Sequence, residues 1–236
     1  MAEILLIRHG QASFGTDDYD RLSDLGHRQA KLAGEFLVRT GVKLDHAYTG
    51  DLLRQKQTYA GVAAAYKEAG QELVAPIALM GYDETKNDEQ VEVLLPQLLD
   101  ADPKVAQYLE NSSTDSKQFQ KLIRAVFTYW QTIEGTQEGL ESWPQFKGRV
   151  LEAFAQTLST ATSGTTSAVF TSGGVIATLV AHILRQSDIE VYPLYEPIIN
   201  ASITRILTNG RDVSISTFNE YSYLQVIGTI KDVTYR

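Results

Sequence analysis

The residues best suited to chemistry in this sequence are an arginine and a histidine that follow a short apolar run near the start of the chain. Residues 4–7 are all apolar, as is typical of a strand buried on both faces, and Arg8, His9 and Gly10 come directly after them. A neutral imidazole is a nucleophile that can accept a phosphoryl group, and a neighbouring guanidinium can hold phosphate oxygens in a bidentate manner. Gly10 lets the backbone approach a ligand closely. On these residues alone, a surface ion pair at Arg8 and a histidine at a strand end explain the pattern equally well.

Length and composition restrict the kind of protein in which these residues are placed. The chain has 236 residues, with 21 Lys plus Arg and 29 Asp plus Glu, which gives a formal net charge of −8. This length suits one large domain or two small ones, and the acidic charge argues against nucleic acid or a membrane surface as a partner. The chain contains no cysteine, which excludes disulfides, cysteine nucleophiles and thiolate metal sites. Because the first apolar run is too short for a signal peptide, we expect a cytoplasmic protein.

Strand-like and helix-like segments alternate along the chain, which predicts an α/β fold. Apolar runs predict strands at residues 4–7, 46–49, 72–75, 168–171, 202–207 and 213–218. Apolar residues at helical spacing predict helices at residues 25–37, 52–66, 143–158 and 175–184, with Ser23 and Thr49 as caps of the first two. Asn209 and Gly210 separate the last two strands and predict a hairpin, so one edge strand is antiparallel. We therefore expect a three-layer α/β/α sandwich with a mostly parallel central sheet.

Residues 81–141 break this alternation. The segment is polar overall and shows helical apolar spacing only at residues 91–99 and 119–133. We expect one domain over residues 1–236, in which residues 81–141 form a mostly helical insertion over the strand ends.

Short motifs follow one another in a fixed order from one end of the chain to the other. They are residues 8–14 (RHGQASF), 19–23 (YDRLS), 49–54 (TGDLLR) with Thr58, 170–176 (FTSGGVI), 200–204 (NASIT) and 218–219 (FN). In this order they resemble the histidine phosphatase superfamily, also called phosphoglycerate mutase-like proteins. The resemblance is closest to bacterial members described only as phosphoglycerate mutase family proteins, and it implies a phosphoglycerate mutase-like fold.

The resemblance also implies a pocket for a phosphoryl group. His9 corresponds to the nucleophile that is transiently phosphorylated, and Arg8 and Arg54 correspond to the cations that hold the phosphoryl oxygens. A second histidine after the strand at residues 168–171 and a carboxylic acid that protonates the leaving oxygen complete the family's pattern. The implied partner is a small phosphorylated substrate or inorganic phosphate, with no cofactor and no metal ion.

The second histidine of the family's pattern is replaced here by Ser172, which Gly173 and Gly174 follow. A serine hydroxyl and the backbone amides at the start of the next helix can still donate to phosphate oxygens. A serine cannot supply the charge of an imidazolium, and losing a charged donor costs about 1.5–3 kcal/mol. This corresponds to about one to two decades in rate.

The carboxylic acid of the pattern has no single counterpart in this sequence. In a tight alignment Gly81 occupies its position, so either Asp83 or Glu84 serves as the acid, or none remains. The alternative interpretation of both residues is a solvated acidic loop. Our predicted catalytic set is Arg8, His9, Arg54 and Glu84, and our predicted substrate-binding set is Gly10, Gln11, Ser13, Ser23, Asp83, Ser172 and Gly173.

The sequence leaves four functions to weigh against one another. The first is a phosphoric monoester hydrolase that acts through a phosphohistidine at His9. The second is a phosphoglycerate mutase-type phosphotransferase. The third is a weakly active or non-catalytic binder of phosphate esters, since Ser172 replaces a histidine and the acid of the pattern has no single counterpart. The fourth, a serine hydrolase at Ser172, lacks the Gly-x-Ser-x-Gly turn because residue 170 is Phe, and His182 follows with no acid between. The ester that is cleaved and the oligomeric state stay open.

Overall fold

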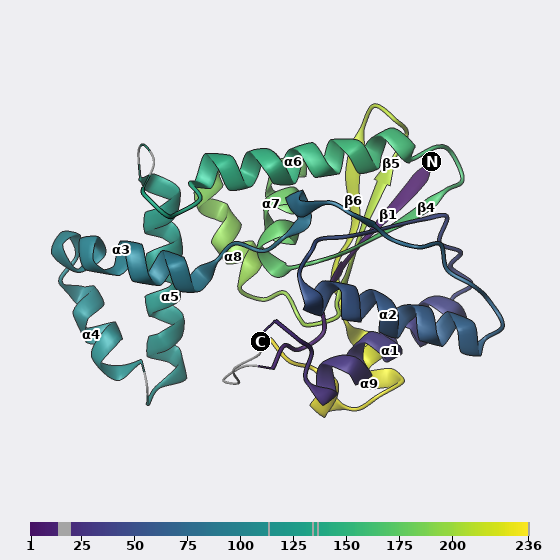
Figure 1. Cartoon of the computed structure of the whole chain (residues 1–236), viewed down its shortest axis with the longest axis horizontal. Coiled ribbons are helices and arrows are strands. Elements are labelled where there is room, and N and C mark those ends of the chain that lie inside the picture. The colour runs from purple at the N-terminus through teal and green to yellow at the C-terminus, as the bar shows by residue number, and fades with distance from the viewer. Residues whose placement is uncertain (14–19, 113, 134, 136, 236) are drawn as a thin grey trace.

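The structure is a computed structural model that describes residues 1–13, 20–112, 114–133, 135 and 137–235, so Phe14 and Tyr19 of the motifs lie outside the described residues. The described residues form a six-stranded sheet with the order β3-β2-β4-β1-β5-β6 (Figure 1). Its strands are β1 (Ala2–Arg8), β2 (His46–Thr49), β3 (Ile77–Ala78), β4 (Thr166–Thr171), β5 (Ile203–Thr208) and β6 (Val213–Glu220).

The sheet is parallel from β3 through β2 and β4 to β1, while β5 runs antiparallel to β1 and to β6. Because successive side chains of a strand point to opposite faces, β1 contributes to two cores. Ile4 and Leu6 pack into one core, and Leu5 and Ile7 pack into the other. All four side chains are fully buried, which explains why this strand is a continuous apolar run.

Helices cover both faces of the sheet, as the predicted α/β/α sandwich requires. One face packs against α1 (Asp24–Arg39), α2 (Leu53–Glu68) and α9 (Ser222–Val226), and the other against α6 (Trp143–Thr160) and α7 (Gly173–Ile183) (Figure 1). The predicted fold class is therefore confirmed. None of the helices in the described part of the chain is long and apolar enough to cross a membrane.

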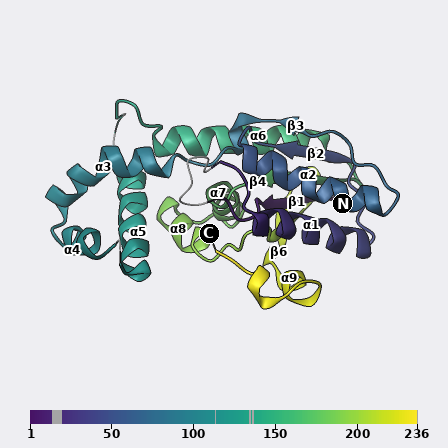
Figure 2. The ribbon, with the colours of Figure 1, turned by 60° about the horizontal axis from the view of Figure 1, so that its bottom comes forward.

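Helices α3 (Asn87–Ala101), α4 (Lys104–Asn111) and α5 (Ser116–Thr132) lie beside the sheet, at the end of the molecule where α8 (Val191–Tyr195) is found (Figures 1 and 2). The predicted apolar spacing at residues 91–99 and 119–133 coincides with α3 and α5. Three short 3-10 helices complete the described elements: η1 (Met80–Tyr82), η2 (Asp188–Glu190) and η3 (Ile230–Asp232). The interpretation of residues 81–141 as an insertion into one domain stays a prediction.

Two local predictions are wrong. Residues 72–75 form no strand: on this side β2 pairs only with the two residues of β3, Ile77 and Ala78. The carbonyl of Val74 instead accepts a hydrogen bond of 2.9 Å from the Tyr59 hydroxyl. Thr49 does not cap α2 either, because it is the last residue of β2, and the helix begins after Leu52 without a side-chain cap.

Candidate active site

Four parallel strands, β3, β2, β4 and β1, end at one edge of the sheet, and the predicted catalytic residues lie at or after the ends of β1, β2 and β3. Arg8 pairs with Thr171 in the register of β1 and β4. The next residues stay together, since the amide of His9 donates to the carbonyl of Thr171 at 2.8 Å. Ligands of α/β sheets bind at this carboxyl edge, so the position of His9 beside Ser172 suits a binding site.

The His9 imidazole is buried, and its two nitrogens have different partners. Nδ1 lies 2.7 Å from the carbonyl oxygen of Gly10, and Nε of Arg54 donates to Nε2 at 3.2 Å. A carbonyl oxygen can only accept and a guanidinium can only donate, so Nδ1 carries the proton and Nε2 carries the lone pair. The unprotonated nitrogen of His9 therefore faces Arg54.

The pKa of His9 is lowered well below its usual value. Burial is the main cause, because it disfavours the charged form, and the positive charges of Arg54 and Arg8 act in the same direction. The hydrogen bond with Gly10 opposes them only in part. His9 is thus a neutral imidazole at neutral pH, the protonation state that nucleophilic attack requires.

Arg54 is buried at the start of α2 and is held by a carboxylate that the sequence analysis did not single out. Its Nη1 lies 2.7 Å from Oδ1 of Asp20, and Oδ2 of Asp20 accepts from the amide of Leu53 at 2.8 Å. Asp20 thereby fixes the guanidinium against the first turn of α2. The sequence feature that could have pointed to Asp20 is its acidic side chain inside the motif at residues 19–23.

Arg8 reaches from the end of β1 toward the start of α7. Its Nη1 donates to the carbonyl of Ile198 and, at 3.0 Å, to the carbonyl of Tyr235. A Cβ atom built on Gly173 would lie 3.6 Å from Nε of Arg8, so this guanidinium lies beside the first turn of α7.

The carboxylate of Glu84 occupies the same turn of α7 and is buried. Its Oε2 accepts from the amide of Gly174 at 3.0 Å, and its Oε1 accepts from the amide of Thr85 at 3.0 Å. Since Arg8 lies beside Gly173 and Glu84 beside Gly174, the fold brings one predicted cation and one predicted acid to the start of α7.

Asp83 turns to the other side of the chain. Its Oδ1 accepts from the amide of Asp51 at 2.6 Å, next to Gly50, so this carboxylate holds the turn that precedes α2. The pKa of Asp83 is raised, chiefly because burial disfavours its charged form. The two neighbouring acids thus contact different segments, Asp83 the turn before α2 and Glu84 the start of α7.

Ser172 is fully buried at the start of α7, and a glutamine supports it. Its hydroxyl accepts from Nε2 of Gln55 at 2.9 Å, and the same Nε2 donates to the carbonyl of Tyr82 at 2.9 Å. Gln55 was not among the predicted site residues; the sequence feature that points to it is a polar residue directly after Arg54. His182 is exposed at the opposite end of α7, so it gives Ser172 no imidazole neighbour.

Gly10 and Ser23 attach the loop after β1 to α2 and to the start of α1. The amide of Gly10 donates to the hydroxyl of Thr58 at 3.1 Å. The Ser23 hydroxyl accepts from the amide of Gly26 at 3.1 Å, which confirms it as the cap of α1, and it donates to Oε1 of Gln11 at 2.9 Å. These bonds give Ser23 and Gln11 structural roles.

Ser13 lies further along the same loop, where its amide donates to the carbonyl of Arg21 at 2.8 Å. Contacts of Gln11, Ser13 and Ser23 with a substrate stay predictions.

A separate cavity of about 230 Å³ lies at the far end of α7 and contains none of the predicted site residues. Its lining includes Trp143, Lys147 and Arg185. No group of three or more His, Asp or Glu side chains in the described ranges is arranged to hold a metal ion.

The family model described as "Histidine phosphatase superfamily (branch 1)" matches residues 4–77 and 108–221, well over half of the chain. Among curated proteins, the chain is 36% identical over 83 residues to a 2,3-bisphosphoglycerate-dependent phosphoglycerate mutase of Bartonella tribocorum, a match that covers 32% of this chain and 40% of that protein. It is 34% identical over 83 residues to a phosphoglycerate mutase of Candida albicans, covering 33% of this chain and 32% of that protein. These matches span well under half of the length of the curated relatives.

Solved structures share the fold over nearly the whole chain. Bacillus stearothermophilus YhfR has a TM-score of 0.66 at 18% identity and covers 95% of this chain and 100% of its own. A mycobacterial glucosyl-3-phosphoglycerate phosphatase with inorganic phosphate has a TM-score of 0.64 at 18% identity, covering 94% and 99%. A phosphoserine phosphatase of Entamoeba histolytica with 3-phosphoglyceric acid has a TM-score of 0.62 at 16% identity, covering 95% and 100%.

Proposed function

Because the chain belongs to the histidine phosphatase superfamily, we propose that it is a phosphoric monoester hydrolase whose nucleophile is Nε2 of His9. The observation that carries this proposal is the state of that imidazole. It is buried and neutral, its proton is on Nδ1, and its lone pair faces the guanidinium of Arg54. A nucleophile of this kind needs no base to deprotonate it before it attacks phosphorus.

The proposed reaction has two steps. First, Nε2 of His9 attacks phosphorus, the bond between phosphorus and the ester oxygen breaks, and Glu84 gives its proton to the leaving oxygen. Next, water attacks the phosphohistidine, the Glu84 carboxylate takes a proton from that water, and phosphate leaves with His9 restored. The Gly10 carbonyl keeps the Nδ1 proton in place throughout.

Positive charge around the phosphoryl group supplies most of the proposed catalysis. Arg8 and Arg54 are the two cations, and the first turn of α7 adds backbone amides and the positive end of a helix dipole. We assign the acid to Glu84 because it lies at this turn, whereas Asp83 is bonded to the turn before α2.

Two observations bear on the substrate. The similar solved structures include phosphatases of small phosphorylated metabolites, which supports a small phosphate monoester as the substrate. The N-terminal similarity to phosphoglycerate mutases keeps phosphoryl transfer between two hydroxyls as the second candidate.

Replacing His9 tests the proposal. We expect His9→Ala to lower the hydrolysis of aryl and alkyl phosphates by at least about three orders of magnitude, because no other group can take the phosphoryl group. Wild-type enzyme quenched during turnover should carry a phosphoryl group that is labile in acid and stable in alkali, and the variant should carry none. His182→Ala is the control, since this exposed side chain lies at the far end of α7. Equal rates for wild type and His9→Ala would disprove the mechanism.

A further inference from the structure

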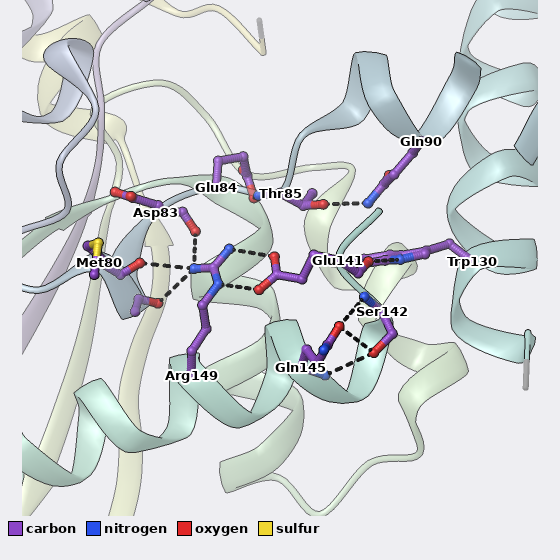
Figure 3. Close-up of polar contacts among 11 residues, drawn as sticks. Met80, Asp83, Glu84, Thr85, Gln90, Trp130, Glu141, Ser142, Gln145 and Arg149 are labelled. Carbon is purple, nitrogen blue, oxygen red and sulfur yellow. Dashed lines mark hydrogen bonds and ion pairs between the residues drawn. The ribbon is translucent and has the colours of Figure 1, made fainter. Parts of the chain in front are cut away.

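Arg149, on α6, binds the backbone of the segment that leads into Glu84. Its Nη1 donates to the carbonyls of Met80 at 3.1 Å, Gly81 at 3.3 Å and Asp83 at 2.8 Å (Figure 3). One guanidinium nitrogen thus donates hydrogen bonds to three carbonyls of a single short segment. The segment also lies flat on α6, because a Cβ atom on Gly81 would come within 2.4 Å of the Arg149 carbonyl oxygen.

The remaining nitrogens of Arg149 are bound by Glu141. Nε and Nη2 donate to its two carboxylate oxygens at 2.6 and 2.9 Å, a bidentate pair (Figure 3). Such pairs fix both the distance and the plane of a guanidinium. The side chain also lies over the Phe146 ring, 4.8 Å from its centroid, so Arg149 is held from several sides.

Glu84 is therefore fixed at two points. Its backbone follows a segment that Arg149 holds on α6, and its carboxylate is bonded to the amide of Gly174 on α7. Helices α6 and α7 cover the same face of the sheet (Figure 1). The place of the carboxylate relative to the phosphoryl group depends on both attachments.

We propose that Arg149 is a positioning residue for proton transfer: it holds residues 80–83 so that Glu84 meets the leaving oxygen. This inference rests on the proposed function, in which Glu84 is the acid. A displacement of a catalytic group by about 1 Å costs about 100-fold in rate. The contribution of Arg149 should therefore appear in the step that needs the proton.

Leaving groups separate a positioning role from a merely structural one. A dinitrophenolate leaves without a proton, whereas an alkoxide must be protonated as it leaves. A misplaced Glu84 thus slows the hydrolysis of an alkyl phosphate and spares a dinitrophenyl phosphate. General damage to the fold lowers both rates in the same proportion.

The experiment compares kcat/KM for 2,4-dinitrophenyl phosphate and β-glycerophosphate. We expect Arg149→Met, which keeps an apolar stem over Phe146, to lose about 100-fold on the alkyl ester and less than about threefold on the aryl ester. Arg149→Lys should lie between, because an ammonium cannot bind the carbonyls and Glu141 together. Glu84→Gln should show the same preference more strongly. The matched control is Arg205→Met, which removes a partly buried ion pair with Glu3 at the other end of β1 and should lower both rates equally.

The outcomes distinguish the inference from the proposed function. If Glu84→Gln affects the two esters differently and Arg149→Met does not, Arg149 is structural only and the inference is wrong. If Glu84→Gln affects both esters equally, or His9→Ala stays active, the proposed function fails instead. Should Arg149→Met not fold, Glu141→Gln is the second variant, because it loosens the bidentate pair and leaves the carbonyl contacts in place. A Glu141→Gln enzyme with unchanged preference between the esters would also overturn the inference.

Discussion

The His9 imidazole is buried and lies near two guanidinium groups. Burial and the two positive charges both oppose its protonation. Its pKa in the folded protein is therefore below the value of about 6.5 that an unfolded chain shows. Between these two pKa values the unfolded state binds more protons than the folded state. The contribution of His9 to the free energy of unfolding therefore decreases as the pH falls below about 6.5. The neutral imidazole that the proposed mechanism requires is retained over the same range.

We expect His9 to stay neutral at a pH where ordinary histidines are half protonated. Titration of the imidazole nitrogens by ¹⁵N NMR should give a midpoint well below 6.5 for the resonances that disappear in His9→Asn. The same spectra should show the proton on Nδ1, since the Gly10 carbonyl requires it. A midpoint at or above 6.5 would contradict the burial and charge argument.

Residue types predicted Arg8 and His9 as a pair, and the family resemblance implied Arg54 as their partner; the fold places all three at one edge of the sheet. The choice between Asp83 and Glu84 could not be made from sequence. Asp83 has an extended backbone, in which successive side chains point to opposite sides, so the neighbours must diverge. Which of them faces α7 is decided by the packing of the segment on α6, which involves residues far away in the sequence.

The first turn of α1 and the loop after β1 meet through their backbones. A Cβ atom on Gly10 would lie 2.4 Å from the carbonyl oxygen of Gly26, and one on Gly26 would lie 2.1 Å from that of Gln11. Only glycine at both positions permits this approach. The contact holds the loop that carries His9 against the first turn of α1.

We expect Gly26→Ala to displace the loop after β1 and to lower activity together with stability. Forcing a methyl group against a carbonyl costs about 1–3 kcal/mol. The matched control is Gly148→Ala in α6, where a Cβ atom meets nothing within 4 Å and alanine should stabilise the helix by about 0.5–1 kcal/mol. Urea unfolding and kcat/KM measure both effects. Full activity in Gly26→Ala would show that the contact does not position His9.

The helices with a clear apolar spacing were predicted from the sequence. Elements whose formation depends on contacts with another part of the chain were not. Helices α1, α6 and α7 follow from their own sequences, because one face or the whole helix is apolar. Helix α4 was missed, since its eight residues carry only one buried side chain, Val105. Residues 72–75 were wrongly predicted as a strand, because a local apolar pattern does not show whether a neighbouring strand is there to pair with them.

Across the whole molecule, segments far apart in the chain meet at Arg8. One of the two carbonyls that accept from its Nη1 belongs to Tyr235, 227 residues away. Thr234 holds this tail: its carbonyl accepts from the amide of Asn200 at 2.8 Å, and its hydroxyl bonds to Asn200 at 2.9 Å and to Gln29 at 2.8 Å. The orientation of Arg8 thus depends on the tail.

We expect Thr234→Val to weaken phosphate binding while the fold persists. Losing the hydroxyl removes two hydrogen bonds of about 1 kcal/mol each. We expect about half of this loss to appear in phosphate binding, so KM for aryl phosphates and the inhibition constant of inorganic phosphate should rise about three- to tenfold. Thr132→Val is the control, because that hydroxyl bonds only within α5. Unchanged constants in Thr234→Val would mean that the tail does not orient Arg8.

The central place of β1 in the sheet also affects how the protein is made. Both neighbours of this strand, β4 and β5, are translated long after it, so an apolar segment leaves the ribosome with nothing to pair with. Such late, distant pairing slows folding and prolongs exposure to aggregation and to chaperones. The proposed nucleophile, His9, emerges with this segment, yet a nascent chain that stops before β4 carries it without Ser172 or the first turn of α7.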